Sequence, residues 1–506
     1  AALGFFFHRT GNAVRREDHR GAGGHFGQLF DEARAHVAIS LAELFAAGSF
    51  REIAESLRHR TVGKPALHGI IPGCGLDSGL LTHSQERMWF LHQLDPQSAA
   101  YHVFGALEMK GTLDVPALDQ AIAAVITRHD ILRSRHATEN GRPRVTVSQD
   151  GIPPLEIREV GDESALRDFL SSFARTPFDL ARDSPIRVAL AACAGDRHVL
   201  AVCAHHIVAD GWSLRILARE IAACYEAVRE RKPAPVFPEK PSYLDYAACH
   251  RRWVNSGAVD SQIEWWKNKL ANHPGVLQLA TDFPRPSRPS SDGGAIEVML
   301  SQELCSRVAN LAKAHRGTPF MVHLAAFLLL LRRHGAGDDP VVAIPVANRN
   351  HAAAGDLIGT LVNTLPFRLS LDPAESFASL LDRVQEAMLE MQANQDAPFE
   401  RIIEAVKPGR SRDHSPLAQV MFDHQELPIA ETWSGGLQCG PHAAHRGAAQ
   451  FDLSLLLTVL HDRQQLTIEY RTDLFLRQTA TSLLDRYLTT LESVCGHPEQ
   501  DRKSVV

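Results

Sequence analysis

The stretch RHVLAVCAHHIVADGWS (residues 197–213) carries the most informative pattern in the sequence. Residues 198–206 alternate in hydrophobicity as a β-strand does, and successive side chains of a strand point to opposite faces. His205 and His206 therefore cannot both face the same cavity. We expect one of them to face a cleft and the other to be packed or hydrogen-bonded behind it.

The residues after the two histidines predict a turn and then a helix. Asp210 and Gly211 end the strand, and Gly211 can take a backbone conformation that is closed to other residues. Ser213 can cap the amphipathic helix expected over 212–231. A strand end that opens into a loop commonly carries catalytic groups, because a rigid scaffold holds them within reach of substrate.

The composition is that of an ordinary globular chain. Hydrophobic residues make up 44% and charged residues 22% of the 506 residues, close to the averages for such proteins. A chain of this length holds two to four domains. The formal net charge is -6 and no basic block occurs, so we expect neither a nucleic-acid-binding surface nor a surface for anionic membranes.

Apolar stretches and cysteines indicate the compartment. LAAFLLLL (324–331) is far shorter than the roughly 20 residues of a membrane span and predicts a core helix. FFF (5–7) is followed at once by polar residues and is not a signal peptide. The eight cysteines show no CxxC pair and no Cys/His cluster at zinc spacing. They predict no metal site, buried thiols in a reducing compartment and a cytoplasmic location.

The periodicity of the chain predicts a short helical segment followed by a large α/β part. Residues 1–60 end in two short helices, and the Gly- and Pro-rich residues 61–79 indicate a linker. The remainder divides into two α/β lobes of similar size, 80–255 and 256–498. Strands are expected at 101–111, 198–206, 338–350 (leading into a loop) and 464–470, and helices at 113–129, 212–231, 319–333 and 376–393.

Seven ordered motifs resemble one known family. AHHIVADGWS (204–213) closely resembles the core motif of the condensation domains of non-ribosomal peptide synthetases, which are members of the chloramphenicol acetyltransferase-like superfamily. Six further stretches resemble the other motifs of the family in the family's order: HSQERMWFLHQL (83–94), RHDILRSRH (128–136), SYLDYA (242–247), IGTLVNTLPFR (358–368), NQDAPFE (394–400) and RDHSPLAQVMF (412–422). FDLSL (451–455) and YRTDLF (470–475) resemble late segments of the family. The resemblance covers about residues 80–498.

The resemblance implies a fold and a place for the motif histidines. Each lobe would be like half of the chloramphenicol acetyltransferase fold, and the two lobes would form a V with a tunnel between them. One carrier-bound thioester would enter from each end. The second histidine of the motif, His206, would lie at the middle of the tunnel, with His205 beside it.

The resemblance also implies which residues support the site. Asp210 would be structural and paired with an arginine of the other lobe, for which Arg349 is the candidate. Gly211 would keep the approach to the histidine open, and Asn363 would lie nearby. Arg87 is expected to have a structural role near the lobe interface.

The implied reaction is amide formation. The α-amine of an acceptor aminoacyl thioester would attack a donor acyl or peptidyl thioester. Donor and acceptor peptidyl carrier domains would present both substrates on phosphopantetheine arms, so the chain itself would bind no cofactor and no metal. An adenylation domain of the same synthetase is a further expected partner. FLHQLDPQSAAYHV (90–103) most resembles the subtype that joins an L-configured donor to an L-amino acid acceptor.

Three alternative functions use the same fold. Epimerisation domains share HHxxxDG but typically continue DGVSW and carry an EGHGRE-like stretch, which this sequence lacks. A stand-alone acyltransferase would share the histidine motif without needing the other six. A non-catalytic docking platform would recruit partner enzymes, but such domains tend to have a damaged histidine motif, and here the motif is intact.

Residues 1–60 resemble the later part of a peptidyl carrier domain. A carrier needs a serine, usually after GGH or GGN, to hold phosphopantetheine. Here GGH is followed by Phe26, and TGN is followed by Ala13, while Ser40 and Ser49 lie in the wrong context. We therefore expect a partial or degenerate carrier segment that takes no phosphopantetheine.

Overall fold

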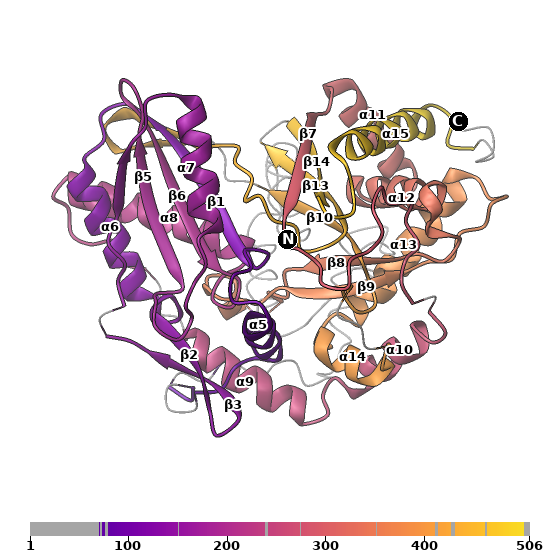
Figure 1. The fold of residues 1–506 in the computed structure, drawn as a ribbon, viewed down its shortest axis with the longest axis horizontal. Coiled ribbons are helices and arrows are strands. Elements are labelled where there is room, and N and C mark those ends of the chain that lie inside the picture. Colours follow the sequence, from indigo (N-terminus) through magenta and orange to yellow (C-terminus); the bar gives the residue numbers. More distant parts are fainter. Residues whose placement is uncertain are drawn as a thin grey trace, which may run out of the picture. The chain divides into compact units, whose positions relative to one another are not determined.

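A computed structural model describes residues 70, 73–75, 79–149, 151–237, 241–273, 275–350, 352–409, 413–426, 431–460 and 463–499. The chain divides into two compact units, Ala1–Ala66 and Leu67–Val506, and all the described residues belong to the second unit. Figure 1 labels its elements. The predicted carrier-like segment 1–60 and most of the predicted linker 61–79 lie outside the described residues.

The first sheet has six strands in the order β11-β12-β1-β6-β5-β4. These strands are β1 (His102–Lys110), β4 (Glu156–Glu159), β5 (Ile186–Ala192), β6 (Arg197–His205), β11 (Glu431–Trp433) and β12 (Leu437–Pro441). The central strands β1 and β6 pair antiparallel along their whole length, which sets His102 opposite His205. A separate hairpin is formed by β2 (Ser134–Glu139) and β3 (Arg142–Val147).

The helices of the first part bury the apolar face of their sequences. α6 (Val115–Arg128) begins at Asp114, whose carboxylate accepts a hydrogen bond from the Ala117 amide at 3.0 Å, as the sequence predicts. α6 packs against α8 (Gly211–Arg229), and α7 (Glu163–Arg175) packs on β1 and β6 (Figure 1). The remaining helices of this part are α5 (His83–Leu94), α9 (Tyr243–Asn255) and the 3₁₀ turn η1 (Asp130–Arg133).

The second sheet has six strands in the order β7-β14-β13-β10-β8-β9. These strands are β7 (Gly293–Met299), β8 (Val341–Val346), β9 (Asn363–Arg368), β10 (Val420–Glu426), β13 (Leu453–Leu460) and β14 (Arg463–Arg471). Strand β10 runs parallel to both β8 and β13, whereas the other pairs are antiparallel.

The helices of the second part pack on this sheet and on one another. They are α10 (Asp260–Lys269), α11 (Gln302–Ala314), α12 (Pro319–Leu331), α13 (Phe377–Ala393), α14 (Phe399–Val406) and α15 (Arg477–Gly496). The short turns are η2 (Arg332–Ala336), η3 (Ala352–Ala354) and η4 (Ser434–Gly436). Helix α12 lies among α11, α13 and α15 and contacts β10.

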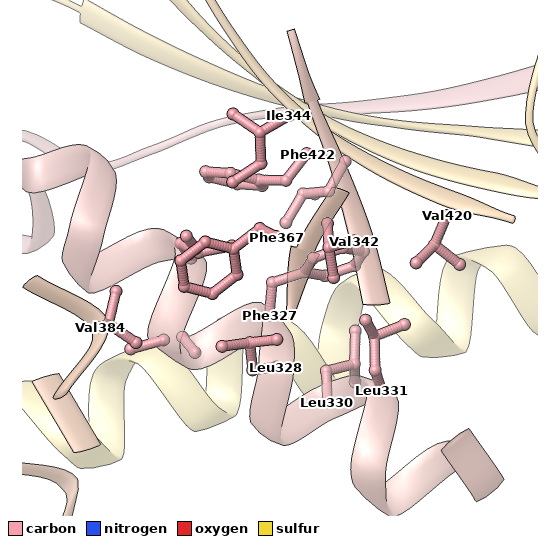
Figure 2. Packing of buried hydrophobic residues seen from close by; sticks show 14 of the residues in the cluster. Phe327, Leu328, Leu330, Leu331, Val342, Ile344, Phe367, Val384, Val420 and Phe422 are labelled. Carbon is pink, nitrogen blue, oxygen red and sulfur yellow. The ribbon is translucent and has the colours of Figure 1, made fainter. Parts of the chain in front are cut away.

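Helix α12 forms the centre of the second hydrophobic core. Its residues 324–331 are all buried, which confirms the predicted core helix. Figure 2 shows Phe327 and Leu328 beside Val342 of β8 and Phe367 of β9. No single helix among the described residues is long and apolar enough to cross a membrane; α11 and α12 with η2 reach that length and composition only together, with a 100° bend between them.

Two strands of the first sheet come from late in the chain. β12 pairs with β1, which sets Met109 opposite Cys439, and β11 pairs with β12. Both strands lie within 256–498, the range predicted for the second lobe. After β12 the chain passes into β13 of the second sheet. Main-chain hydrogen bonds therefore tie the late part of the chain to the first sheet.

Candidate active site

The two histidines of the motif lie where β6 ends. The His205 amide donates to the Pro185 carbonyl at 2.9 Å, and the His206 amide donates to the Tyr101 carbonyl at 2.7 Å. Strand β6 stops at His205, and α8 begins at Gly211. The sheet therefore fixes the backbone of both histidines from two sides, while the loop between them and α8 is free of strand pairing.

His205 is the packed member of the pair. Its side chain is buried, and its Nδ1 accepts a hydrogen bond from the Ile207 amide at 3.1 Å. The rings of His92, His102 and Phe178 surround it at centroid distances of 5.5, 6.1 and 6.2 Å. Burial lowers the pKa of His205 well below its ordinary value, so the ring is neutral and acts as a packing and hydrogen-bonding group.

His206 is only half-buried, and its imidazole is held neutral. Burial lowers the pKa of His206, and the guanidinium groups of Arg446 and Arg87 lower it further, against the opposing effect of the Asp210 carboxylate. Its Nδ1 atom is buried without a hydrogen-bond partner among the described residues. The Thr360 hydroxyl donates to the His206 carbonyl oxygen. A neutral imidazole on a fixed backbone can accept a proton near neutral pH.

Asp210 is buried and has four hydrogen-bond partners in two parts of the chain. Its carboxylate accepts from the Ser213 amide at 2.8 Å and from the Ser213 hydroxyl at 2.7 Å. The Nη2 atom of Arg349 lies 3.0 Å from both carboxylate oxygens, and the Leu361 amide donates at 3.2 Å. The structure thus brings together Asp210 and Arg349, the pair that the sequence resemblance implies.

Two details of this loop differ from the sequence prediction, although Ser213 does take part in capping α8. The N-cap of α8 is Asp210, and Ser213 is the third helical residue, whose hydroxyl accepts from the Asp210 amide to complete a capping box. Gly211 does not need a special backbone conformation, because it is the first residue of α8 and is not among the positive-φ glycines. A methyl group added at Gly211 would meet no atom within 4 Å, so space is open at this position.

Arg349 makes further contacts in the site. Its Nη1 atom donates to the carbonyls of Ala354 and Leu357, both at 2.7 Å, and its guanidinium lies 5.7 Å from the Trp212 ring centroid. The side chain is 4% exposed. Arg349 therefore organises its own loop while it neutralises Asp210.

Residues 355–361, from the second half of the chain, contact the loop between β6 and α8, which we call the histidine loop. Besides the Thr360 and Leu361 contacts, the Gly359 amide donates to the Ser213 hydroxyl at 3.1 Å, and the Trp212 indole donates to the Gly355 carbonyl at 2.9 Å. We call residues 355–361 the clamp segment. Because its contacts reach the carbonyl of His206 and the first turn of α8, it sets the position of the loop between them.

Gly359 of the clamp segment is a place where only glycine fits. Its φ is +156°, and an added Cβ would lie 1.9 Å from Cδ2 of Tyr243. The Tyr243 hydroxyl in turn donates to the Thr360 carbonyl at 2.8 Å. The close approach of α9 thus holds the clamp segment against the histidine loop.

Asn363 lies just beyond the clamp segment and fixes another loop. Its amide nitrogen donates to the carbonyls of Gln395 and Ala397 at 3.0 and 2.8 Å, and its oxygen accepts from the Phe399 amide at 3.1 Å. Asn363 also borders a small cavity. The cavity is lined by Thr82, Ser84, Tyr246, His250, Asn348, Thr360, Leu361, Asn363, Asp396 and Pro398.

Arg87 connects α5 to α14. Its Nη1 lies 3.7 Å from Oε1 of Glu400, and its guanidinium lies 5.2 Å from the Phe399 ring centroid. Neither Glu400 oxygen has a hydrogen bond to the described residues, and burial raises the pKa of this carboxyl. Arg87 therefore joins residues far apart in sequence, close enough to His206 to affect its pKa.

Thr360 and Arg446 belong to the site but were not singled out from the sequence. Thr360 lies inside IGTLVNTLPFR, a stretch matched to the family, so the sequence could indicate that it lies near the site but not that it contacts His206. Arg446 donates to the His102 carbonyl at 3.2 Å and pairs with the buried Glu469 at 3.1 Å. No sequence pattern marks Arg446, because the chain brings it to the site only through the crossing from β12 to β13.

The two six-stranded sheets and the histidine at the end of β6 agree with the two-lobed, chloramphenicol acetyltransferase-like acyltransferase that the sequence resemblance implies. A family model for the condensation domain matches residues 77–506, and the chain belongs to that family. Condensation domains of non-ribosomal peptide synthetases catalyse amide bond formation. The family and the fold class predicted from the sequence are thereby confirmed, except for the carrier-like segment.

Two curated relatives show the same relationship. The chain is 35% identical over 435 residues to a dimodular nonribosomal peptide synthase of Bacillus subtilis (strain 168), covering 83% of this chain and 18% of the relative. It is 34% identical over 448 residues to malpinin synthetase of Mortierella alpina, covering 88% of this chain and 6% of the relative. The chain thus spans only a small part of the length of these relatives.

A solved structure shares the fold over nearly its full length. The X-domain in its complex with OxyB from teicoplanin biosynthesis has a TM-score of 0.77 and 28% identity to this chain, covering 88% of this chain and 99% of that one. This similarity extends through both sheets.

Proposed function

We propose that this chain joins a donor acyl or peptidyl thioester to the α-amine of an acceptor aminoacyl thioester in non-ribosomal peptide synthesis. Both substrates are presented on phosphopantetheine arms of carrier domains, and the donor and the acceptor are L-configured. The similarity to multidomain synthetases supports carrier and adenylation domains as partners. The two α/β lobes, 80–255 together with β11 and β12, and the remainder of 256–498, would hold the two substrates between them.

The position of His206 is the observation that carries this proposal. Its half-buried imidazole follows directly after a central strand, and Tyr101 and Thr360 fix its backbone from different parts of the chain. The lowered pKa leaves the ring neutral near pH 7. An imidazole in this state can receive a proton from an attacking amine.

The reaction needs modest chemical assistance. An α-amine has a pKa of about 7.7–8.0, so an appreciable fraction is neutral near pH 7. The amine nitrogen attacks the thioester carbonyl, the C–N bond forms, and the C–S bond breaks. His206 takes the amine proton as attack proceeds, or holds the amine and stabilises the charged intermediate, and the proton ends on the carrier thiol. Because both substrates are tethered, much of the acceleration comes from proximity and orientation.

The supporting residues act through the loop. Asp210 and Arg349 neutralise each other in a buried setting, cap α8 and bind the clamp segment. Ser213 and Asn363 extend this network to α8 and to residues 395–399. An added methyl group at Gly211 would meet nothing within 4 Å, which supports the expected role of Gly211 in keeping the approach open.

A reconstitution tests the proposal. Donor and acceptor carriers are loaded with different L-amino acids, mixed with the purified chain, and read by mass spectrometry of the intact carriers. The expected result is a gain of the donor acyl mass on the acceptor carrier, with loss from the donor. Inversion of the donor without transfer, detected by chiral chromatography of the amino acid released from its carrier, would instead indicate an epimerase. Transfer from a soluble thioester at the same rate as from the carrier would indicate a stand-alone acyltransferase.

A docking platform is the second candidate function. The X-domain in the similar structure is in complex with another protein, OxyB, and this chain shares its fold. The intact HHIVADG motif and the complete Asp210–Arg349 network favour catalysis over docking alone. The same reconstitution separates the two functions, because a platform gives no acyl transfer from either carrier.

A further inference from the structure

Two cysteines far apart in sequence lie in direct contact. The Sγ atoms of Cys74 and Cys249 are 3.3 Å apart, although 175 positions separate the residues. Both are reduced thiols; Cys249 is buried in α9, and Cys74 is partly exposed. An S–S bond is about 2.05 Å long, so the two sulfurs need to approach by only about 1.2 Å.

The short segment that carries Cys74 is seated on α9. The Gly75 amide donates to Oδ1 of Asp245 at 2.8 Å, and the Cys74 thiol lies 3.7 Å from the Asp245 carbonyl. A Cβ at Gly75 would lie 2.1 Å from the Leu244 carbonyl oxygen, so glycine permits this close approach. Two independent contacts thus hold Cys74 opposite Cys249.

The groups around the two cysteines set how readily Cys74 ionises. The Arg252 guanidinium lies 3.9 Å from the Cys249 sulfur. Burial and the neighbouring Cys249 raise the pKa of Cys74, the Asp245 carboxylate adds to this rise, and Arg252 opposes it. The Cys74 thiolate is therefore scarce at neutral pH and becomes more abundant as the pH rises, so oxidation is slow and quickens in alkaline buffer.

We propose that Cys74 and Cys249 form a redox-sensitive disulfide site that locks the segment before α5 onto α9. With hydrogen peroxide as the oxidant, the Cys74 thiolate attacks the O–O bond to give a sulfenic acid and one water after protonation. The Cys249 thiolate then attacks Sγ of Cys74, forming the S–S bond and releasing a second water. Two thiols and one peroxide become one disulfide and two waters, and a dithiol reductant reverses the step.

The position of this site gives the cross-link a consequence. Cys249 is flanked in α9 by Tyr246 and His250, which line the cavity beside Thr360 and Asn363. The cross-link closes a chain loop from Cys74 to Cys249, which contains α5 and the histidine motif 204–213. Closing so long a loop stabilises a folded protein mainly by restricting its unfolded chain.

Mass spectrometry after peroxide treatment tests the proposal on the full chain without any carrier or substrate. We expect the intact mass to fall by two hydrogen atoms and a peptide map to join the Cys74 and Cys249 peptides. The thermal midpoint should rise by about 5 °C and return after reduction. The cross-linking rate should increase with pH.

Matched variants decide the outcome. Cys74→Ser, at the partly exposed position, should abolish both the cross-link and the thermal shift, whereas Cys193→Ser, at another partly exposed cysteine, should leave both intact. The proposal is overturned if peroxide converts Cys74 only to sulfinic or sulfonic acid, or if the joined peptides persist in Cys74→Ser. Because the readout is a covalent mass, its failure is independent of whether the chain forms amide bonds.

Discussion

The Arg349 guanidinium holds both carboxylate oxygens of Asp210 at 3.0 Å across 139 positions of sequence. Both side chains are nearly inaccessible, at 4% and 5% exposure. Asp210 also caps α8, and Arg349 also ties two carbonyls of its own loop. One ion pair thus fixes two loops at once, and the position of His206 depends on both.

Removal of one partner should therefore damage the fold as well as the reaction. Asp210→Ala leaves the Arg349 charge buried and unpaired, which typically costs about 3–5 kcal/mol. We expect the free energy of unfolding in urea to fall by that amount and acyl transfer to be lost. Lys267→Ala is the matched control, because its pair with Glu264 is exposed on both sides. An Asp210→Ala variant as stable as the parent would show that the pair does not organise the loop.

The clamp segment should be sensitive at Gly359. Gly359→Ala places a methyl group 1.9 Å from the Tyr243 ring, so the segment must move away from α9 and loosen its contacts with His206 and Ser213. We expect a loss of about 1–3 kcal/mol in unfolding free energy and slower acyl transfer. Gly161→Ala, where an added methyl meets nothing within 4 Å, should change neither. Equal behaviour of the two variants would argue against the clamp.

Local signals in the sequence predicted most of the framework. The strand of 198–206, the helix capped by Asp114 and the apolar α12 all follow from periodicity and capping, which depend on near neighbours. The return of β11 and β12 to the first sheet could not be predicted, because pairing between distant strands leaves no short-range pattern. Arg446 reaches the site through that return and was missed for the same reason.

The site itself was predicted in part. Both histidines and Asp210 were named from the motif, Arg349 was named as the expected partner of Asp210, and the structure brings these residues together. The sequence predicted a cap at Ser213, whereas the N-cap of α8 is Asp210, because Asp and Ser are both favoured at that position and the helix begins one residue earlier than expected. The contacts of Thr360 could not be seen, since they depend on how one part of the chain lies against the other.

Buried histidines should make the protein sensitive to acid. His136 is fully buried, neither of its ring nitrogens has a hydrogen bond to the described residues, and burial lowers its pKa to about 3. Because the unfolded chain binds the proton below about pH 6.5 and the folded chain does not, stability falls as the pH drops below that value. By pH 5 this one group costs about 2 kcal/mol relative to pH 7.

Urea unfolding of His136→Phe at the two pH values checks this expectation. The aromatic replacement keeps the packing against Trp89, whose ring lies 6.3 Å away, and it removes the titrating group. The loss of stability between pH 7 and pH 5 should shrink by about 2 kcal/mol in the variant. An unchanged pH dependence would mean that His136 takes up its proton equally in the folded and the unfolded chain.

The strongest functional prediction concerns His206→Ala. The His206 ring is half-buried, and its Nδ1 has no hydrogen-bond partner among the described residues, so its removal should alter the unfolding free energy by less than about 1 kcal/mol. Loss of a group that accepts the amine proton or stabilises the intermediate should slow acyl transfer by about 100-fold or more. His205→Ala is the contrasting variant, because it empties a packed position and breaks the bond to the Ile207 amide, and so should lower stability. Acyl transfer at the parent rate by a folded His206→Ala protein would remove the histidine from the reaction.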